Sequence, residues 1–287
     1  MQFIKRLDLI DRIAILLTFL FVLAGSLVSL NRYWQYEIFY YDFGIFDRAI
    51  WQVAHFSPPV VDHLVVSGKW IFADHFHPSI FLLSPLYWFT NRSEILLIVQ
   101  AVIVGLSGLV LFLLSKKILK NDFASLTVLI SYFLFIGLQN AVISDFHEVT
   151  VATLPLALFF WAIINKKIKW FIIFGLLTLG FKESNFILGA ALGIFIMLFD
   201  KRWFKVGIST TIFSLIYGFL VIKFVIPYFS GGSYAYSEPL NFNPLFILQT
   251  FINNQVKINT IFYSLLSFSF LPIFSPSFLI LIAQDFL

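Results

Sequence analysis

The stretch IAILLTFLFVLAGSLVSL, residues 13–30, contains no charged residue and is long enough to cross a bilayer as a helix. The rest of the chain has the same character, because 60% of its 287 residues are hydrophobic and only 12% are charged. A soluble protein cannot expose so little charge and stay in solution. The composition therefore predicts an all-α integral membrane protein, and the length is sufficient for about seven to nine spans.

Clusters of lysine and arginine predict the orientation of the chain in the membrane. Positive charge is enriched at the cytoplasmic ends of spans, and four such clusters alternate consistently with the N-terminus inside. They account for the net charge of +4, so we expect no nucleic-acid partner. A cleaved signal peptide is the alternative for the first run, but its length and the later spans favour an uncleaved helix. The clusters are Lys5, Arg6 and Arg12; Lys116, Lys117 and Lys120; Lys166, Lys167 and Lys169; and Lys201, Arg202 and Lys205.

The same alternation predicts two outer loops. Residues 31–93 form the first, and within it residues 45–53 carry apolar side chains at helical spacing, which predicts a helix lying in the membrane interface. Residues 79–89 are too short to span and contain a proline, so we expect an interfacial or re-entrant segment there. Residues 227–244, rich in turn formers and tyrosines, form the second outer loop.

A short hairpin is expected between two of the lysine clusters. The apolar runs 170–181 and 186–199 are both short, and the tip between them is KESN, residues 182–185. The chain stops within an apolar run, which predicts a single transmembrane domain, residues 1–287, that is truncated at its C-terminus. Further spans are expected at residues 94–114, 123–143, 149–164 and 206–226.

Two aspartates stand where the chain leaves the first span. The stretch YYDFGIFDRAIW, residues 40–51, contains Asp42 and Asp47, which are five positions apart and therefore about 140° apart around a helix. Asp42 has the residue type of a helix N-cap, and Asp47 has that of a solvated surface charge. Both are also candidates for catalytic carboxylates. All five histidines and most acids fall on the outer side of this topology, so an active site would face outward.

Two short outer segments, ADHFHPS and SDFHE, carry nitrogen and oxygen ligands of the kind that bind divalent cations such as Mg²⁺ or Mn²⁺. Their spacing matches no zinc signature, and histidines that make only structural hydrogen bonds are the alternative. The segments contribute Asp74, His75, His77, Asp145, His147 and Glu148, and the candidate metal ligands are Asp42, His75, His147 and Glu148.

Lys182 and Glu183 occupy the tip of the short hairpin, where charge is costly unless it is paired or lines a wet cavity. One interpretation is an ion pair that closes the turn. The other is that Lys182 binds a phosphate while Glu183 orients it. The chain has no cysteine, which excludes thiol catalysis and zinc–thiolate sites, and it has no glycine-rich phosphate loop or G-x-S-x-G motif.

Four stretches in order, YYDFGIFDRAIW, HFHPSIFLLSPLYWF, DFHEVTVATLPLALFFWAI and KESNFILGAALGIF, resemble the uncharacterised DUF2079 family of prokaryotic multi-pass membrane proteins. The similarity extends to LPIFSPS near the end of the chain. That family in turn is similar to the GT-C membrane glycosyltransferases, which have an acidic residue in a long first outer loop with interfacial helices. The spacing D-x-x-x-x-D departs from the adjacent acidic pair of that group.

The resemblance implies a GT-C-like helical bundle in the prokaryotic cell membrane. It implies an enzyme that takes a sugar from a polyprenyl-phosphate carrier on the outer face and transfers it to an acceptor hydroxyl. Membrane lipid and the lipid-linked sugar would be its partners. On this basis Asp42 is the leading candidate for the catalytic base, with Asp47 beside it. The implied substrate-binding residues are His75, His77, Asp145, His147, Glu148, Lys182 and Glu183, the last two bracketing the carrier phosphate.

Two other functions remain open from the sequence. A lipid or solute transporter would also place charged pairs and broken helices within the membrane, although the sequence has no inverted repeat. A scaffold protein is the third alternative, but it would not explain the charges at the hairpin tip.

Overall fold

The computed structural model describes residues 8–64, 69–236, 243, 245, 249 and 255–275. These residues form helices, and the one β pairing among them is an isolated bridge between Val60 and Trp70. Three stretches are long and apolar enough to cross a membrane, and a bent helix pair makes a possible fourth. The expectation of about seven to nine spans is therefore not met in the described residues, where the remaining apolar helices are shorter. The three stretches are α1 (Leu9–Trp34), α4 (Glu94–Leu119) and Lys201–Ser230.

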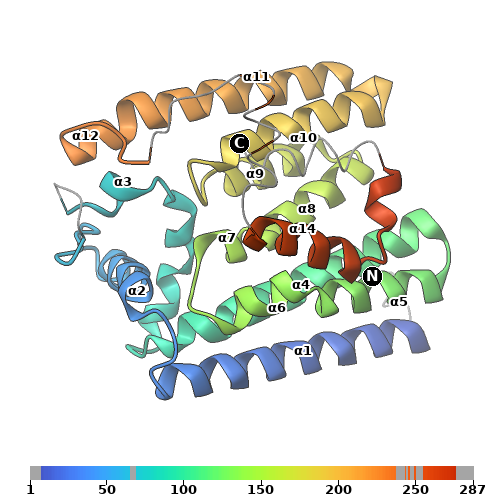
Figure 1. Ribbon diagram of the computed structural model, residues 1–287, viewed down its shortest axis with the longest axis horizontal. Coiled ribbons are helices and arrows are strands. Elements are labelled where there is room, and N and C mark those ends of the chain that lie inside the picture. Colours follow the sequence, from blue (N-terminus) through green and yellow to red (C-terminus); the bar gives the residue numbers. More distant parts are fainter. Residues whose placement is uncertain are drawn as a thin grey trace, which may run out of the picture. The chain divides into compact units, whose positions relative to one another are not determined.

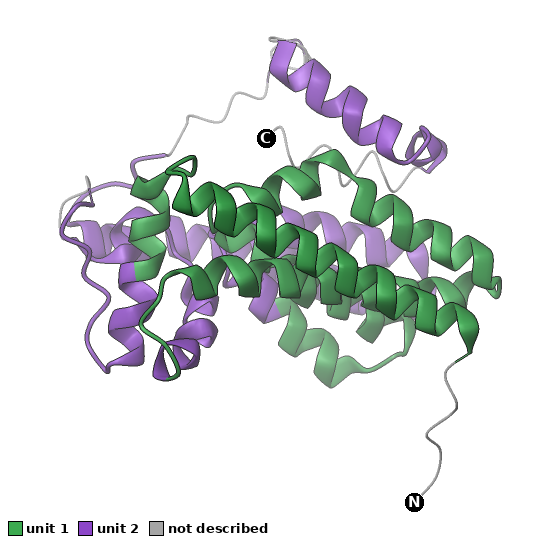
Figure 2. Cartoon of the chain, turned by 90° about the horizontal axis from the view of Figure 1, so that it is seen from below, with its two compact units in different colours: residues 1–47, 89–175 green, residues 48–88, 176–287 purple. Residues whose placement is uncertain are grey.

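The chain divides into two compact units, and each unit combines two separate stretches of sequence (Figure 2). Unit 1 contains residues 1–47 and 89–175, and unit 2 contains residues 48–88 and 176–287. The chain passes into unit 2 within α2 (Tyr40–Ala54), returns to unit 1 between Trp88 and Phe89, and passes into unit 2 again within α9 (Ile168–Leu179).

In unit 1, α4 is the central helix, and α1 runs along it (Figure 1). Small residues allow a close approach, because a Cβ atom on Gly105 of α4 would collide with Val22 of α1. The buried side chains of Ala14, Phe112 and Leu129 form one core cluster of this unit. The other helices on α4 are α5 (Asp122–Leu134), α6 (Ile136–Ile143), α7 (Glu148–Val151) and α8 (Thr153–Ile164).

The expected single span over residues 123–143 is bent. Its two parts, α5 and α6, meet at Phe135 with an angle of 50° between them. Phe135 has extended backbone angles, and the Gln139 side chain donates a hydrogen bond to the carbonyl oxygen of Phe133 near the break. A carbonyl freed from the helix ladder is thereby satisfied, which is what a break inside a membrane requires.

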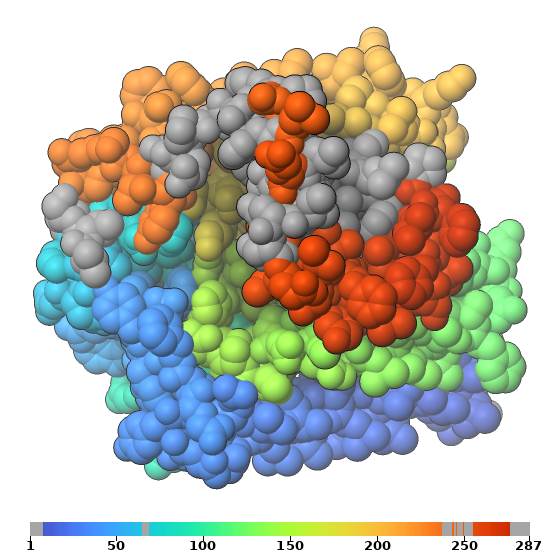
Figure 3. All heavy atoms as spheres, viewed as in Figure 1, coloured from blue at the N-terminus to red at the C-terminus, as the bar shows by residue number. Residues whose placement is uncertain are grey.

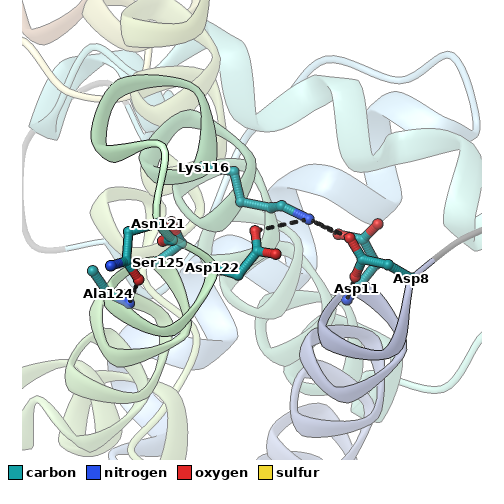
Figure 4. Close-up of polar contacts among 7 residues, drawn as sticks. All are labelled: Asp8, Asp11, Lys116, Asn121, Asp122, Ala124 and Ser125. Carbon is teal, nitrogen blue, oxygen red and sulfur yellow. Dashed lines mark hydrogen bonds and ion pairs between the residues drawn. The ribbon is translucent and has the colours of Figure 1, made fainter.

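One lysine joins three helix ends in unit 1 (Figure 4). Lys116 Nζ, in the last turn of α4, lies 2.7 Å from Asp11 Oδ1, 2.9 Å from Asp8 Oδ2 and 3.3 Å from Asp122 Oδ1. The two aspartates at the start of α1 and the one at the start of α5 are at helix N-termini, and the lysine is at a helix C-terminus. Each charge therefore also suits the helix dipole.

The side of α1 away from its neighbours carries exposed apolar side chains. Its spheres are visible along its length in Figure 3. In a protein with candidate spans of this kind, we assign this surface to lipid. Its most exposed members include Leu16, Phe19, Leu20, Leu23 and Leu27.

The helix predicted from residues 45–53 exists as α2, and the expectation that Asp42 is its N-cap was wrong. Its apolar residues Ile45, Phe46, Ala49 and Ile50 are buried within the protein, so they do not form a lipid-facing surface. Asp42 lies in the first turn of α2, because the helix begins two residues earlier at Tyr40, and it is therefore not the N-cap. The carboxylate remains favourably placed against the helix dipole.

Unit 2 contains the end of α9 from Leu176 onward, the KESN tip and α10 (Asn185–Phe199), together with the long stretch after it. α10 packs against α11 (Phe204–Leu220) with touching backbones, since a Cβ atom on Gly193 would lie 2.7 Å from the Gly207 oxygen. The helix continues as a π-helical turn, Val221–Val225, and α12 (Ile226–Ser230).

The segment predicted to be interfacial, residues 79–89, forms the 3₁₀ helix η1 (Pro78–Trp88) after the short helix α3 (Ile71–Asp74). Ser79 at its start is tied to the hairpin. Its N–H donates to the Gly180 oxygen at 2.9 Å and its Oγ to the Leu177 oxygen at 2.9 Å. These bonds hold the ADHFHPS segment beside the KESN tip.

Some expectations lie outside the described residues. They concern Lys5 and Arg6, most of the second outer loop beyond Tyr236, and the final apolar run over residues 276–287. The last described elements are α14 (Gln255–Ser267) and the 3₁₀ turn Leu271–Phe274.

Candidate functional site

Unit 1 brings together three polar side chains from two distant segments. Asp42 comes from the first turn of α2, and Asp145 and His147 come from the loop between α6 and α7. One possible ligand atom from each residue lies within 4.8 Å of the others. Two carboxylates and an imidazole are a donor set that suits Mn²⁺, Mg²⁺ or Zn²⁺.

We call Asp42, Asp145 and His147 the cation cluster. Asp145 is its most buried member, with 5% of its surface exposed. Its Oδ1 lies 3.4 Å from His147 Nδ1, while its buried Oδ2 makes no hydrogen bond among the described residues. Hydrogen bonding to the Asp145 carboxylate raises the pKa of His147, although burial opposes the charge, and Glu148 and Asp42 add to the effect. An ionised carboxylate with an oxygen left over is costly unless a cation binds it, so the residues fit a metal ion.

Three other residues predicted for this site are not among the ligand donors of the cation cluster. Glu148 is buried beside it and acts on His147 through its charge, but it is not one of the three ligand donors. Asp47 lies further along α2, where its charge acts on Tyr33, and it is not in the cluster. His75, also a predicted metal ligand, belongs to unit 2.

A second polar cluster lies in unit 2 around Glu183, which is only 1% exposed. Its Oε1 accepts from His75 Nδ1 at 2.7 Å and from the Tyr234 hydroxyl at 2.6 Å. Its Oε2 accepts from the backbone N–H of Phe76 at 2.9 Å. Both oxygens of this buried carboxylate therefore have donors.

In this second cluster, Glu183 and His75 each favour the charged form of the other. Burial would raise the pKa of Glu183, but the bonds from His75 and Tyr234 outweigh it and lower the pKa to about 2. Burial likewise opposes a charge on His75, but Glu183 and Asp74 raise its pKa above the usual value, against a smaller opposing effect of Lys182. We conclude that Glu183 favours the protonated form of His75 and that the two then form an ion pair whose carboxylate is buried.

The residues next to this pair come from the same two segments and from the second outer loop. The Tyr236 ring stacks on His75 with centroids 4.8 Å apart, and its hydroxyl donates to Asp74 Oδ1 at 2.9 Å. His77 is buried nearby, with its ring centroid 6.4 Å from that of His75. Lys182 is half-buried at the hairpin tip.

Sequence reasoning missed three residues that support these clusters: Gln100, Tyr234 and Tyr236. Gln100 was missed because it lies in an apolar span, where a single amide side chain among hydrophobic residues was the only indication of a role. The two tyrosines were interpreted as part of a turn-rich loop, and no signal in the sequence indicated that both would reach the ADHFHPS and KESN segments.

The family described as "Predicted membrane protein (DUF2079)" matches residues 32–284 of this sequence. The chain belongs to the DUF2079 family. Both clusters of this DUF2079 protein lie within the matched residues. No match was found among curated proteins or among solved structures.

Proposed function

We propose that this DUF2079 protein is a membrane glycosyltransferase that moves a sugar from a polyprenyl-phosphate carrier to an acceptor hydroxyl on the outer face of the prokaryotic cell membrane. The observation that carries the proposal is the cation cluster. An acid that directly follows the first membrane span meets an acid and a histidine from a loop about 100 residues later in the chain. Such a convergence of polar side chains from distant segments is what a functional site requires.

In the proposed reaction Asp42 takes the proton of the acceptor hydroxyl. The acceptor oxygen forms a bond to the anomeric carbon as the bond from that carbon to the phosphate oxygen breaks, and the carrier phosphate leaves with the electron pair. A divalent cation held by Asp42, Asp145 and His147 would neutralise charge that develops on this phosphate. No nucleotide site is required, because a lipid-linked donor arrives through the bilayer.

The cluster of unit 2 is proposed, by itself, as a phosphate-binding group. Lys182 and His75, when its imidazole is protonated, are cationic groups that suit a phosphate. Glu183 was expected to bracket the phosphate with Lys182, but both of its oxygens are bonded to protein groups. Its role in the proposal is therefore to hold His75 in its charged form.

The test is transfer by the full chain in proteoliposomes that contain polyprenyl-phosphate sugars and candidate acceptors. Asp42→Asn should abolish transfer with an unchanged melting temperature. Asp122→Asn, the matched change at the start of α5, should leave transfer intact. Full activity of Asp42→Asn would overturn the assignment of the base. Native mass spectrometry of protein purified in mild detergent should also detect a carrier or its sugar conjugate, and the mass of the conjugate would identify the sugar.

A transporter or flippase is the second candidate, and the break between α5 and α6 favours it. Broken helices are typical of membrane transporters, where the freed backbone groups line a substrate path. The same proteoliposomes distinguish the two functions. Movement of the carrier between leaflets without any transfer to an acceptor would support transport.

A further inference from the structure

Gln100 lies in the membrane-spanning helix α4 and makes three hydrogen bonds to backbone groups of unit 1, one in the last turn of α6 and two in the loop that follows it. Its Nε2 donates to the Ala141 oxygen at 3.1 Å and to the Asp145 oxygen at 3.0 Å. Its Oε1 accepts from the backbone N–H of His147 at 2.9 Å. The side chain has no exposed surface. One amide hydrogen is therefore used on the end of α6, and the other hydrogen and the amide oxygen are used on the backbone of the loop.

Two of these hydrogen bonds go to the backbones of Asp145 and His147, which are both members of the cation cluster. The carbonyl of Asp145 and the N–H of His147 lie on either side of Phe146, so the amide fixes the backbone on both sides of that residue. A buried amide in an apolar helix is costly, and an aliphatic side chain would fill the same space. Packing alone does not explain a glutamine here.

Phe146 supplies a second restraint on the same loop. Its side chain is fully buried, and its ring contacts that of Phe46 edge-on with centroids 5.5 Å apart. Phe46 lies one helical turn after Asp42 on α2, so this contact connects the loop to the helix that carries the third member of the cluster. The loop is thus held by an amide from α4 and by a ring from α2.

We propose that Gln100 is the positioning residue of the cation cluster. It sets the backbone of Asp145 and His147 so that their side chains converge with Asp42, and it does not touch the cation itself. Outer groups that orient metal ligands typically change metal affinity by about 10- to 100-fold. This inference rests on the cation site of the proposed function, but it does not require the site to transfer sugar.

The test is Mn²⁺ binding to the purified full chain in detergent, followed by electron paramagnetic resonance. Wild-type protein should bind Mn²⁺, and the bound ion should show a nitrogen coupling from His147. Gln100→Met, which has a similar volume without the amide, should bind about 10- to 100-fold more weakly and lose the nitrogen coupling. A general loss of packing would not remove that coupling selectively.

Ser107→Ala is the matched control. Ser107 is buried seven residues further along α4, where its Oγ bonds to the Val104 oxygen and the Tyr132 hydroxyl. It should lose hydrogen bonds in the same helix while keeping wild-type Mn²⁺ affinity and coupling. Gln100→Asn is the second variant if Gln100→Met does not fold, since its shorter amide cannot reach the loop equally well and should also weaken binding.

Two outcomes would overturn the proposal. If a folded Gln100 variant binds Mn²⁺ with wild-type affinity and nitrogen coupling, Gln100 does not position the site. If wild-type protein binds no Mn²⁺, the cluster is not a cation site. The first result leaves the transferase proposal unchanged. The second removes the cation from the proposed reaction, while transfer itself is tested by the separate assay with Asp42→Asn.

Discussion

Asp145 in unit 1 and Glu183 in unit 2 are both buried carboxylates, but their oxygens have different surroundings. Glu183 receives three hydrogen bonds, from an imidazole, a phenol and a backbone N–H, which together cover both oxygens. Asp145 has His147 at 3.4 Å from one oxygen, while the other makes no hydrogen bond among the described residues.

This difference separates a structural charge from a ligand-binding one. A buried carboxylate with donors on every side is neutralised by the protein and stabilises its own unit. A buried carboxylate with an oxygen that accepts no hydrogen bond destabilises the folded protein, and a bound cation offsets this desolvation penalty. In both cases a histidine lies beside the carboxylate, but His147 is two residues from Asp145 in the sequence, whereas His75 is far from Glu183.

The largest effect on stability should come from Glu183→Gln. The change leaves the charged form of His75 without its partner, and losing one member of a buried pair costs about 3 kcal/mol or more. The apparent melting temperature in detergent measures this loss. A variant as stable as wild type would contradict the structural role of Glu183.

Tyr234→Phe should have the next largest effect. It removes one hydrogen bond to the Glu183 carboxylate, and hydrogen bonds to charged groups contribute about 1.5–3 kcal/mol. Tyr236→Phe is the control in the same loop, and it should cost less because its partner Asp74 is more exposed than Glu183. Equal effects in chemical unfolding would show that the ion pair does not depend on Tyr234.

The stability of unit 2 should depend on pH through the same pair. The pKa of Glu183 is lowered from 4.5 to about 2, so its contribution is present above pH 4.5 and is lost as the pH falls toward 2. The pKa of His75 is raised above 6.5, so its contribution is complete below pH 6.5 and is lost as the pH rises through the raised value. The melting temperature should therefore be highest between these limits, and His75→Gln should flatten the alkaline side of the curve.

The smallest effect on stability should come from Asp145→Asn, by less than about 1 kcal/mol, because the change removes a buried charge that the protein only partly neutralises. Mn²⁺ binding should nevertheless be lost. A strong destabilisation with unchanged Mn²⁺ binding would reverse the comparison, since Asp145 would then be structural.

Local features predicted part of this fold and the candidate site. The helical spacing in residues 45–53 predicted α2, and the short apolar runs within residues 170–199 predicted the two short helices α9 and α10. The same spacing could not tell whether Ile45, Phe46 and Ala49 face lipid or protein, because both are apolar surroundings. Nor could it predict the break at Phe135, where no proline or glycine pair marks a kink.

The sequence by itself determined that the chain is a helical membrane protein and which polar residues are available for chemistry, because hydropathy and residue type are local properties. The tertiary structure decided which of them meet. Asp42 and Asp145 are separated by more than 100 residues and join through α2, α4 and the Phe46–Phe146 contact. Whether a buried carboxylate is satisfied also depends on such distant donors, as Glu183 with His75 and Tyr234 shows. Hydrogen bonds between distant segments arise only when the chain folds.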